Sequence, residues 1–207
     1  MDFGVPKMDE ELLFRYLFIA IYAAFFGVRI RYRIESTRRE PEKRHQLYFM
    51  ATKIMIIAIL GYFASIILYM LAPPWTSWSQ IALPTWLRWL GVIGATSSVL
   101  LVAWIHRELG RQYSAELAIQ KEHALVTTGP YARTRHPMYT VLNMFSFSMA
   151  LTTSNLLVLL FAALIIVPFP WIARKEEEML LETFGEDYRE YMERTGRLFP
   201  RIRLRPS

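Results

Sequence analysis

The chain has 207 residues, of which 54% are hydrophobic, and its mean hydropathy is +0.22. Soluble domains are usually about 45–50% apolar, so this composition favours a membrane protein. Cysteine is absent, which excludes disulfide bonds, thiolate metal ligands and a cysteine nucleophile. The formal net charge is +6, and basic loops facing anionic lipid explain it without a nucleic-acid partner.

Long segments with almost no charged residue predict membrane-spanning helices, each of which needs about 20 apolar residues. The first, residues 12–28, contains one charge, Arg15. It follows a mildly acidic stretch rather than the basic start of a cleaved signal peptide, so we expect a span of the mature protein. The next two predicted spans are residues 47–72, which end at a pair of prolines, and residues 86–105.

The last uncharged run, residues 137–173, is long enough for two helices. The sequence Thr-Thr-Ser-Asn at residues 152–155 predicts a helix stop followed by an Asn155 cap, and hence a helical hairpin. Pro168 and Pro170 should kink or break the second helix of this hairpin. We therefore predict an all-α integral membrane protein with five transmembrane helices, because these segments lack the polar face of soluble core helices.

The distribution of Lys and Arg predicts the orientation in the membrane, since cytoplasmic loops are enriched in both. Basic residues gather in 29–46, in 106–136 and after residue 173, whereas 73–85 and 152–155 contain none. The N-terminus is then outside and the C-terminus in the cytoplasm. Four tryptophans flanking the 73–85 loop predict an interfacial aromatic belt, and Arg88 is expected to snorkel to water from its span end.

Two polar segments remain once the spans are set aside, residues 106–136 and the tail from about 172. The predicted hairpin joins them, so we expect them to lie close together. The chain is accordingly divided into three N-terminal helices, residues 1–105, and a C-terminal half that contains both polar segments, residues 106–207. Within the connector, the short apolar stretches Ala115–Ile119 and Ala124–Thr127 are expected to pair as extended segments.

A candidate site follows from charged residues at the ends of the hairpin. Arg133, Arg135 and His136 directly precede the predicted helix start at Pro137, where free N–H groups and the helix dipole favour an anionic group. Glu176 and Glu177 lie at the other end and could bind an amine or hydroxyl groups, or could be a solvated helix start. Together these residues predict a site for a zwitterionic ligand, whose identity the residues alone leave open.

Two separated motifs carry a resemblance to a known family. The sequences HALVTTGPYARTRHPMY and EEEMLLETFGEDYREYMERTGRLFP resemble the integral-membrane methyltransferases of the isoprenylcysteine carboxyl methyltransferase type. The phospholipid N-methyltransferases are more distant relatives. The resemblance covers about residues 109–200. This chain has Val141 where the family often has glycine, and Ile172 where it usually has arginine.

The resemblance implies S-adenosylmethionine as cofactor, with S-adenosylhomocysteine as product, bound in a cytoplasmic pocket of the C-terminal half. It also implies an amphiphilic prenyl- or lipid-linked substrate that enters from the bilayer. Carried over by position, the cofactor-binding residues are His123, Leu125, Val126, Gly129, Tyr131, His136 and Glu176. The catalytic candidates are Arg135, Glu177 and Arg133, with Arg135 expected to orient the substrate or steady charge during transfer.

The implied activity is methyl transfer to the carboxylate of a prenylated cysteine. Methylation of a phospholipid amine is one alternative, and a nicotinamide-dependent membrane reductase is another. A channel or scaffold is disfavoured because no predicted span holds a charge deep in its middle.

Overall fold

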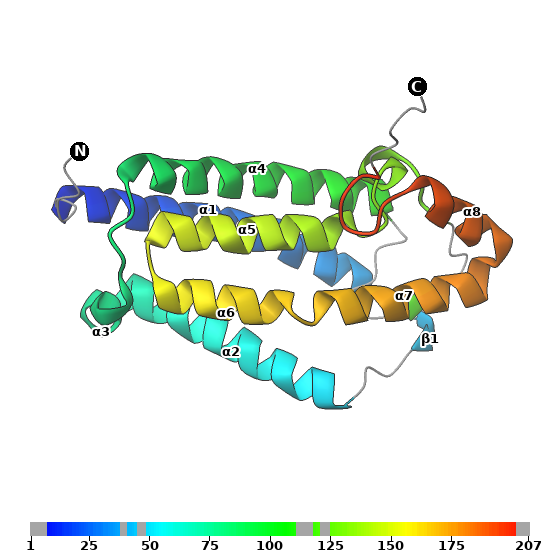
Figure 1. The fold of residues 1–207 in the computed structure, drawn as a ribbon, viewed down its shortest axis with the longest axis horizontal. Helices are drawn as coiled ribbons and strands as arrows, with labels where there is room; N and C mark the ends of the chain where they lie inside the picture. Colours follow the sequence, from blue (N-terminus) through cyan, green and yellow to red (C-terminus); the bar gives the residue numbers. More distant parts are fainter. Residues whose placement is uncertain (1–7, 38–40, 45–48, 111–117, 121–124, 202–207) are drawn as a thin grey trace, which may run out of the picture. The chain divides into compact units, whose positions relative to one another are not determined.

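The computed structural model describes residues 8–37, 41–44, 49–110, 118–120 and 125–201, most of which are helical (Figure 1). The helices are α1 (Met8–Thr37), α2 (Phe49–Leu71), α3 (Pro73–Thr76), α4 (Thr85–Leu109), α5 (Pro137–Thr153), α6 (Leu156–Ile166), α7 (Phe169–Phe184) and α8 (Glu186–Arg194). Two 3₁₀ turns, η1 (Ser77–Ser79) and η3 (Gly129–Ala132), lie between them. The predicted helical architecture is confirmed for these residues.

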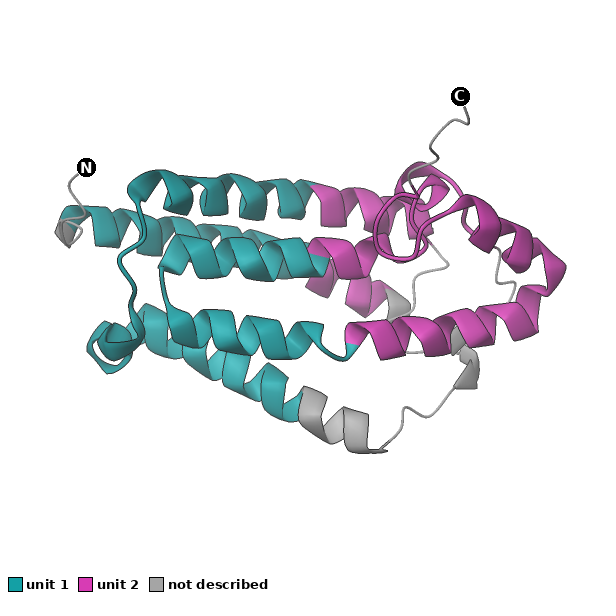
Figure 2. Ribbon diagram, in the orientation of Figure 1, with its two compact units in different colours: residues 1–28, 47–100, 142–168 teal, residues 29–46, 101–141, 169–207 magenta. Residues whose placement is uncertain are grey.

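The chain divides into two compact units that interleave along the sequence (Figure 2). Unit 1 comprises residues 1–28, 47–100 and 142–168, and unit 2 comprises residues 29–46, 101–141 and 169–207. Helices α1, α4 and α5 each contribute residues to both units. Each unit is described by itself below.

Unit 1 is a helical core packed through aromatic side chains. Helix α2 packs along α6, and Gly61 makes this close approach possible, since a Cβ there would lie 2.0 Å from the Phe161 ring. The rings of Phe25 and Phe145 stack with centroids 3.7 Å apart, which joins α1 to α5. Apolar burial of this kind drives the packing of the helices.

The predicted stop between α5 and α6 is confirmed. Helix α5 ends at Thr153, and the Asn155 side chain accepts hydrogen bonds from the Leu157 and Val158 amides in the first turn of α6, at 3.0 and 3.2 Å. The Asn155 amide also donates to the Thr76 carbonyl at 3.2 Å, and the Ser79 hydroxyl donates to Asn155 Oδ1 at 3.1 Å. One buried side chain therefore caps a helix and holds the loop before α4.

The predicted break near the prolines is also confirmed. Helix α6 ends at Ile166, the chain turns at Val167 and Pro168, and α7 begins at Phe169. Pro170 lies in the first turn of α7, where its missing N–H is not needed. The break separates an apolar helix in unit 1 from a helix that carries charged residues in unit 2.

Among the described residues, three helices are long and apolar enough to cross a membrane. They are Asp9–Glu35, Thr85–Leu109 and Leu156–Phe184, the last of which includes the turn between α6 and α7, and Ile56–Leu71 is a shorter apolar helix. These helices are those of an integral membrane protein. The count of five spans and the orientation of the termini stay predictions.

The expectation that Arg88 snorkels to water is wrong. Its side chain is buried, 1% exposed, and forms an ion pair with Glu11 at 2.6 Å. Its Nε donates to the Thr152 carbonyl at 3.2 Å, and its guanidinium lies 4.0 Å from the centre of the Phe14 ring. Sequence reasoning missed this because the partner carboxylate comes from α1, 77 residues earlier.

The predicted pairing of extended segments in the connector is wrong as well. Strand β2 (Ala118–Gln120) pairs antiparallel with β1 (Pro41–Arg44), which follows α1. Residues 125–127 have no regular secondary structure. The described fold is thus helical except for one small sheet in unit 2, whose strand β1 comes from a loop that the local pattern did not point to.

Candidate active site

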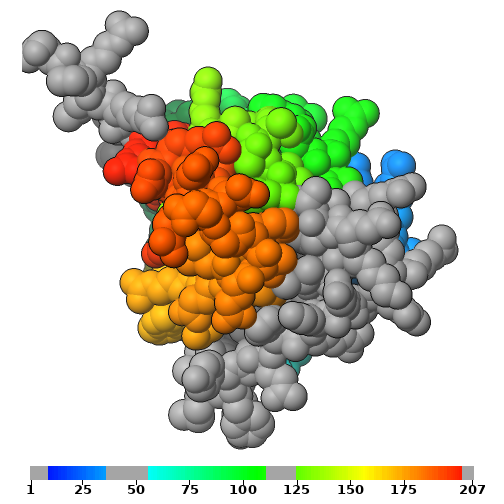
Figure 3. Space-filling view, turned by 90° about the vertical axis from the view of Figure 1, so that its right-hand side faces the viewer, coloured from blue at the N-terminus to red at the C-terminus, as the bar shows by residue number. Residues whose placement is uncertain are grey.

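The candidate site lies in unit 2, where the segment before α5 meets α7, α8 and the segment that follows α8. Figure 3 shows this face, on which the yellow-green atoms of the first segment adjoin the orange and red atoms of the others. Five charged residues form what we call the polar cluster: Arg135, His136, Glu176, Glu177 and Arg197. They come from three parts of the chain.

The turn that leads into the cluster requires a glycine. Gly129 has φ +56°, a conformation that residues with a side chain rarely adopt. A Cβ there would also lie 2.7 Å from the carboxyl carbon of Glu108, whose carboxylate accepts a hydrogen bond from the Thr128 hydroxyl. The turn then buries Tyr131, and the Tyr191 hydroxyl donates to the Tyr131 carbonyl at 2.7 Å.

Backbone hydrogen bonds join the segment before α5 to the segment after α8. Thr134 and Gly196 form a parallel bridge. The Arg135 amide donates to the Gly196 carbonyl at 2.8 Å, and the His136 amide donates to the Arg197 carbonyl at 3.0 Å. The Gly196 amide donates back to Arg133 at 3.1 Å. These bonds hold the side chains of Arg135, His136 and Arg197 near α7.

Glu177 is the centre of the cluster and is buried, at 3% exposure. Its carboxylate accepts from Arg135 Nε at 2.8 Å and from Arg197 Nη2 at 2.6 Å, and lies 3.2 Å from His136 Nε2. Charge-assisted hydrogen bonds of this length are strong, and a buried carboxylate needs such partners to remain ionised. Glu177 therefore acts as an anchor for three segments of the chain.

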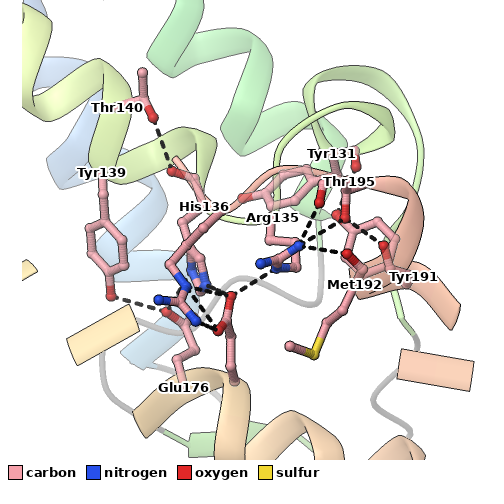
Figure 4. A network of polar contacts seen from close by, with 11 residues as sticks. Tyr131, Arg135, His136, Tyr139, Thr140, Glu176, Tyr191, Met192 and Thr195 are labelled. Atoms are coloured by element: carbon pink, nitrogen blue, oxygen red, sulfur yellow. Dashed lines mark hydrogen bonds and ion pairs between the residues drawn. The ribbon is translucent and has the colours of Figure 1, made fainter. Parts of the chain in front are cut away.

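The neighbouring Glu176 has a different environment. Its Oε2 accepts from the Tyr139 hydroxyl at 3.0 Å and lies 3.3 Å from His136 Nδ1 (Figure 4). Its side chain is 33% exposed, and within the described part of the chain Oε1 has no hydrogen-bond partner. One of the two adjacent glutamates is thus fully engaged, and the other offers a free oxygen.

His136 lies between the two carboxylates and is only 5% exposed. Burial alone would favour the neutral ring, but hydrogen bonds and charge from Glu176 and Glu177 outweigh burial and raise the pKa of His136 above its ordinary value. Both ring nitrogens face a carboxylate oxygen. Neither nitrogen is therefore free to face a substrate.

The Arg135 guanidinium is held on two sides. Besides Glu177, its Nη1 donates to the carbonyls of Met192 at 3.0 Å and Thr195 at 2.6 Å (Figure 4). The side chain is 9% exposed. It fastens the end of α8 to α7.

The structure brings Arg135, His136, Glu176 and Glu177 together, all of which sequence analysis singled out. Of the other candidates, Tyr131 is buried beside Tyr191, Leu125 and Val126 are half-buried, and Gly129 and Arg133 are exposed. His123 lies outside the described residues. The roles assigned to these residues stay predictions.

Sequence analysis missed two members of the site. Tyr139, which hydrogen-bonds Glu176, lies three residues after His136 in the quoted motif, so helical spacing could have placed it on the same face. Arg197 gave no comparable signal, because it lies 20 residues after Glu177 in a segment without periodicity. Among the described residues, no group of three or more His, Asp or Glu is placed to hold a metal ion.

Residues 86–187 match the family model described as phospholipid methyltransferase. The match includes the turn at Gly129, the Arg-His-Pro segment and both glutamates. The matched segment comprises 102 of the 207 residues. The methyltransferase resemblance predicted from the two motifs is confirmed.

Two curated relatives carry names that refer to metal resistance. The chain is 28% identical over 153 residues to the nickel-cobalt-cadmium resistance protein NccN of Alcaligenes xylosoxydans xylosoxydans, covering 72% of this chain and 66% of that protein. It is 34% identical over 90 residues to the cobalt-zinc-cadmium resistance protein CzcN of Cupriavidus metallidurans, covering 41% of this chain and 39% of that protein. The chain therefore spans less than two thirds of either relative.

Among solved structures, the chain is similar to the eukaryotic intramembrane Ras methyltransferase ICMT, isoprenylcysteine carboxyl methyltransferase. The TM-score is 0.51 at 20% identity, and the match covers 90% of this chain and 68% of the other. At this identity the likeness establishes a shared fold.

Proposed function

We propose that this protein transfers a methyl group from S-adenosylmethionine to a lipid-like acceptor, with the carboxylate of a prenylated cysteine as the first candidate. The observation that carries the proposal is the match of residues 86–187 to a methyltransferase family, because the matched segment contains both glutamates and the Arg-His-Pro turn. The shared fold supports the same reading.

The residues present fit this cofactor. S-adenosylmethionine carries an ammonium, a sulfonium, a carboxylate and ribose hydroxyls, so it needs an accessible anionic oxygen. Glu176 offers its Oε1, which has no partner within the described residues, on a side chain that is 33% exposed. Leu125 and Val126, both half-buried, would add apolar contacts. His123 stays a candidate ligand outside the described residues.

The chemistry of the site favours an acceptor that is already anionic. The cofactor, when bound, would supply a methyl group on a sulfonium, and transfer to a carboxylate forms a C–O bond while the C–S bond breaks and leaves a neutral thioether. No proton has to be removed. The task of the protein is then to align the two groups and exclude water, which can supply about 7–11 kcal/mol of the barrier.

Methylation of a phospholipid amine is the second candidate, favoured by the description of the matched family. An amine must lose a proton before or during transfer. His136 does not suit this task, because both its nitrogens face carboxylates and neither is free to face the amine. Glu176 would have to accept the proton, which makes the amine the less favoured acceptor.

Transfer of labelled methyl groups from S-adenosylmethionine tests the proposal. We expect product with a farnesylcysteine analogue, less with phosphatidylethanolamine, and a strong loss in Glu176→Ala. Glu178→Ala is the matched control, because Glu178 is an exposed glutamate on the same helix. Equal activity of the two variants would contradict the assignment of Glu176, and absence of transfer to either acceptor would contradict the proposed function.

We further propose that the N-terminus is outside and the site faces the cytoplasm, with the substrate entering from the bilayer. Because the chain contains no cysteine, single-cysteine variants report orientation directly. Ser77→Cys and Glu186→Cys change exposed residues in different predicted compartments. An impermeant thiol reagent added to intact cells should label only Ser77→Cys. Labelling of only Glu186→Cys would show that the orientation is the opposite of the proposed one.

A further inference from the structure

The two arginines that contact Glu177 differ in how many of their N–H groups are bound. Arg135 is 9% exposed, and its Nε and Nη1 are bound to Glu177 and to the carbonyls of Met192 and Thr195. Releasing it would remove one of the donors to buried Glu177 and its hydrogen bonds to the two carbonyls. These contacts describe Arg135 as a positioning residue, and its expected role in orienting the substrate or steadying charge stays a prediction.

Arg197 is bound on one edge only. Its Nε donates to Glu177 at 3.0 and 3.1 Å and its Nη2 at 2.6 Å, so Glu177 occupies the side of the guanidinium. A guanidinium has five N–H donors in a fixed fork. Two are used here, and within the described residues the Nη1 pair and the second Nη2 hydrogen have no partner. The side chain is 38% exposed, which leaves this end accessible.

Arg197 is the accessible cation of the polar cluster. The side chains of Arg135 and His136 are 9% and 4% exposed, whereas that of Arg197 is 38% exposed. A planar guanidinium with two free, parallel N–H groups is suited to a carboxylate or phosphate, which it can bind with both oxygens.

We propose that Arg197 binds the anionic group of the methyl acceptor, a carboxylate or a phosphate, through the end of its guanidinium that Glu177 leaves free. This inference rests on the proposed methyl-transfer function and adds to it the residue that selects the acceptor. Glu177 fixes the direction of the arginine, and Arg135 and His136 keep Glu177 in place. A carboxylate bound in this way keeps lone pairs available for the incoming methyl group.

The test measures binding to protein saturated with S-adenosylhomocysteine, by calorimetry in detergent. Three amphiphiles are compared: a farnesylcysteine analogue, its carboxamide, and phosphatidylethanolamine. Arg197→Gln removes the charge, and Arg197→Lys keeps the charge but not the fork. Arg189→Gln is the control, because Arg189 is 66% exposed and contacts Glu186 in a surface pair at 3.7 Å.

In the parent protein we expect the carboxylate to bind about 10- to 100-fold more tightly than the carboxamide, the range typical of a hydrogen bond to a charged group. This preference should disappear in Arg197→Gln, be intermediate in Arg197→Lys and be unchanged in Arg189→Gln. Affinity for S-adenosylhomocysteine should stay within about twofold of the parent in all three, since Glu177 keeps Arg135 and His136. If phosphatidylethanolamine alone loses affinity, the anionic group is the lipid phosphate.

An unchanged affinity for the farnesylcysteine analogue and for phosphatidylethanolamine in Arg197→Gln would overturn the inference. So would a parallel loss of S-adenosylhomocysteine binding, because Arg197 would then act on the cofactor. Failure of the parent protein to bind S-adenosylhomocysteine is a different result, which would overturn the proposed function itself.

Discussion

Replacement of Glu177 by glutamine tests whether this residue is the anchor of the site. The change preserves shape but removes the charge that balances Arg135 and His136, both of which are buried. Loss of one partner from a buried ion pair typically costs about 3–5 kcal/mol, because the remaining charge has no compensation. The Arg197 contact adds at most about 1 kcal/mol, because that side chain is 38% exposed and is screened by solvent. We expect Glu177→Gln to lower the free energy of unfolding by about 3–5 kcal/mol.

Denaturant unfolding in detergent micelles, followed by tryptophan fluorescence, measures this loss. Glu178→Gln is the matched control, since Glu178 is 58% exposed and pairs with Lys175 at the surface. Its effect should stay within about 0.5 kcal/mol, as for most surface substitutions. Adding Arg135→Met to Glu177→Gln should restore part of the loss, because the unpaired cation is then gone. A loss below about 1 kcal/mol in Glu177→Gln would refute the anchoring role.

Three further predictions concern neighbouring features. The pKa of His136 is raised in the fold from 6.5, so the stability that protonation of His136 adds to the fold is fully present below about pH 6.5 and is lost as the pH rises through the raised pKa. His136→Gln should abolish this pH dependence of the free energy of unfolding. Gly129→Ala should destabilise more than Gly110→Ala in thermal unfolding, because both glycines have positive φ but only at 129 does the Cβ meet the Glu108 carboxyl; equal losses would contradict this. Asn155→Ala should cost about 1–2 kcal/mol and speed hydrogen exchange at the first amides of α6, whereas unchanged exchange would rule out the cap.

Local signals in the sequence predicted much of the helical fold. Prolines and the Thr-Thr-Ser-Asn stretch act through the backbone of their immediate neighbours, so the ends of α2, α5 and α6 follow from the sequence. Long-range pairing carries no such signal. The ion pair between Arg88 and Glu11, and the partner of strand β2, depend on which helices and loops meet in space.

The candidate site shows the same division. Arg135, His136 and the two glutamates stand out as charges at the ends of an apolar hairpin, and they do come together. The difference between Glu176 and Glu177 could not be predicted, because adjacent residues on a helix point about 100° apart and only the packing decides which is buried. Arg197 was missed because the segment after α8 is irregular, and backbone bonds to Arg135 and His136 place it.

Calorimetric titration of the detergent-solubilised protein with S-adenosylhomocysteine tests the central claim most directly. Methyl transfer predicts saturable binding with one site per chain, loss of that binding in Glu176→Ala, and parent-like affinity in Glu178→Ala. NADPH, titrated in parallel, should not bind. Absence of binding at high micromolar S-adenosylhomocysteine, or preferential binding of NADPH, would contradict the methyltransferase proposal and favour a reductase.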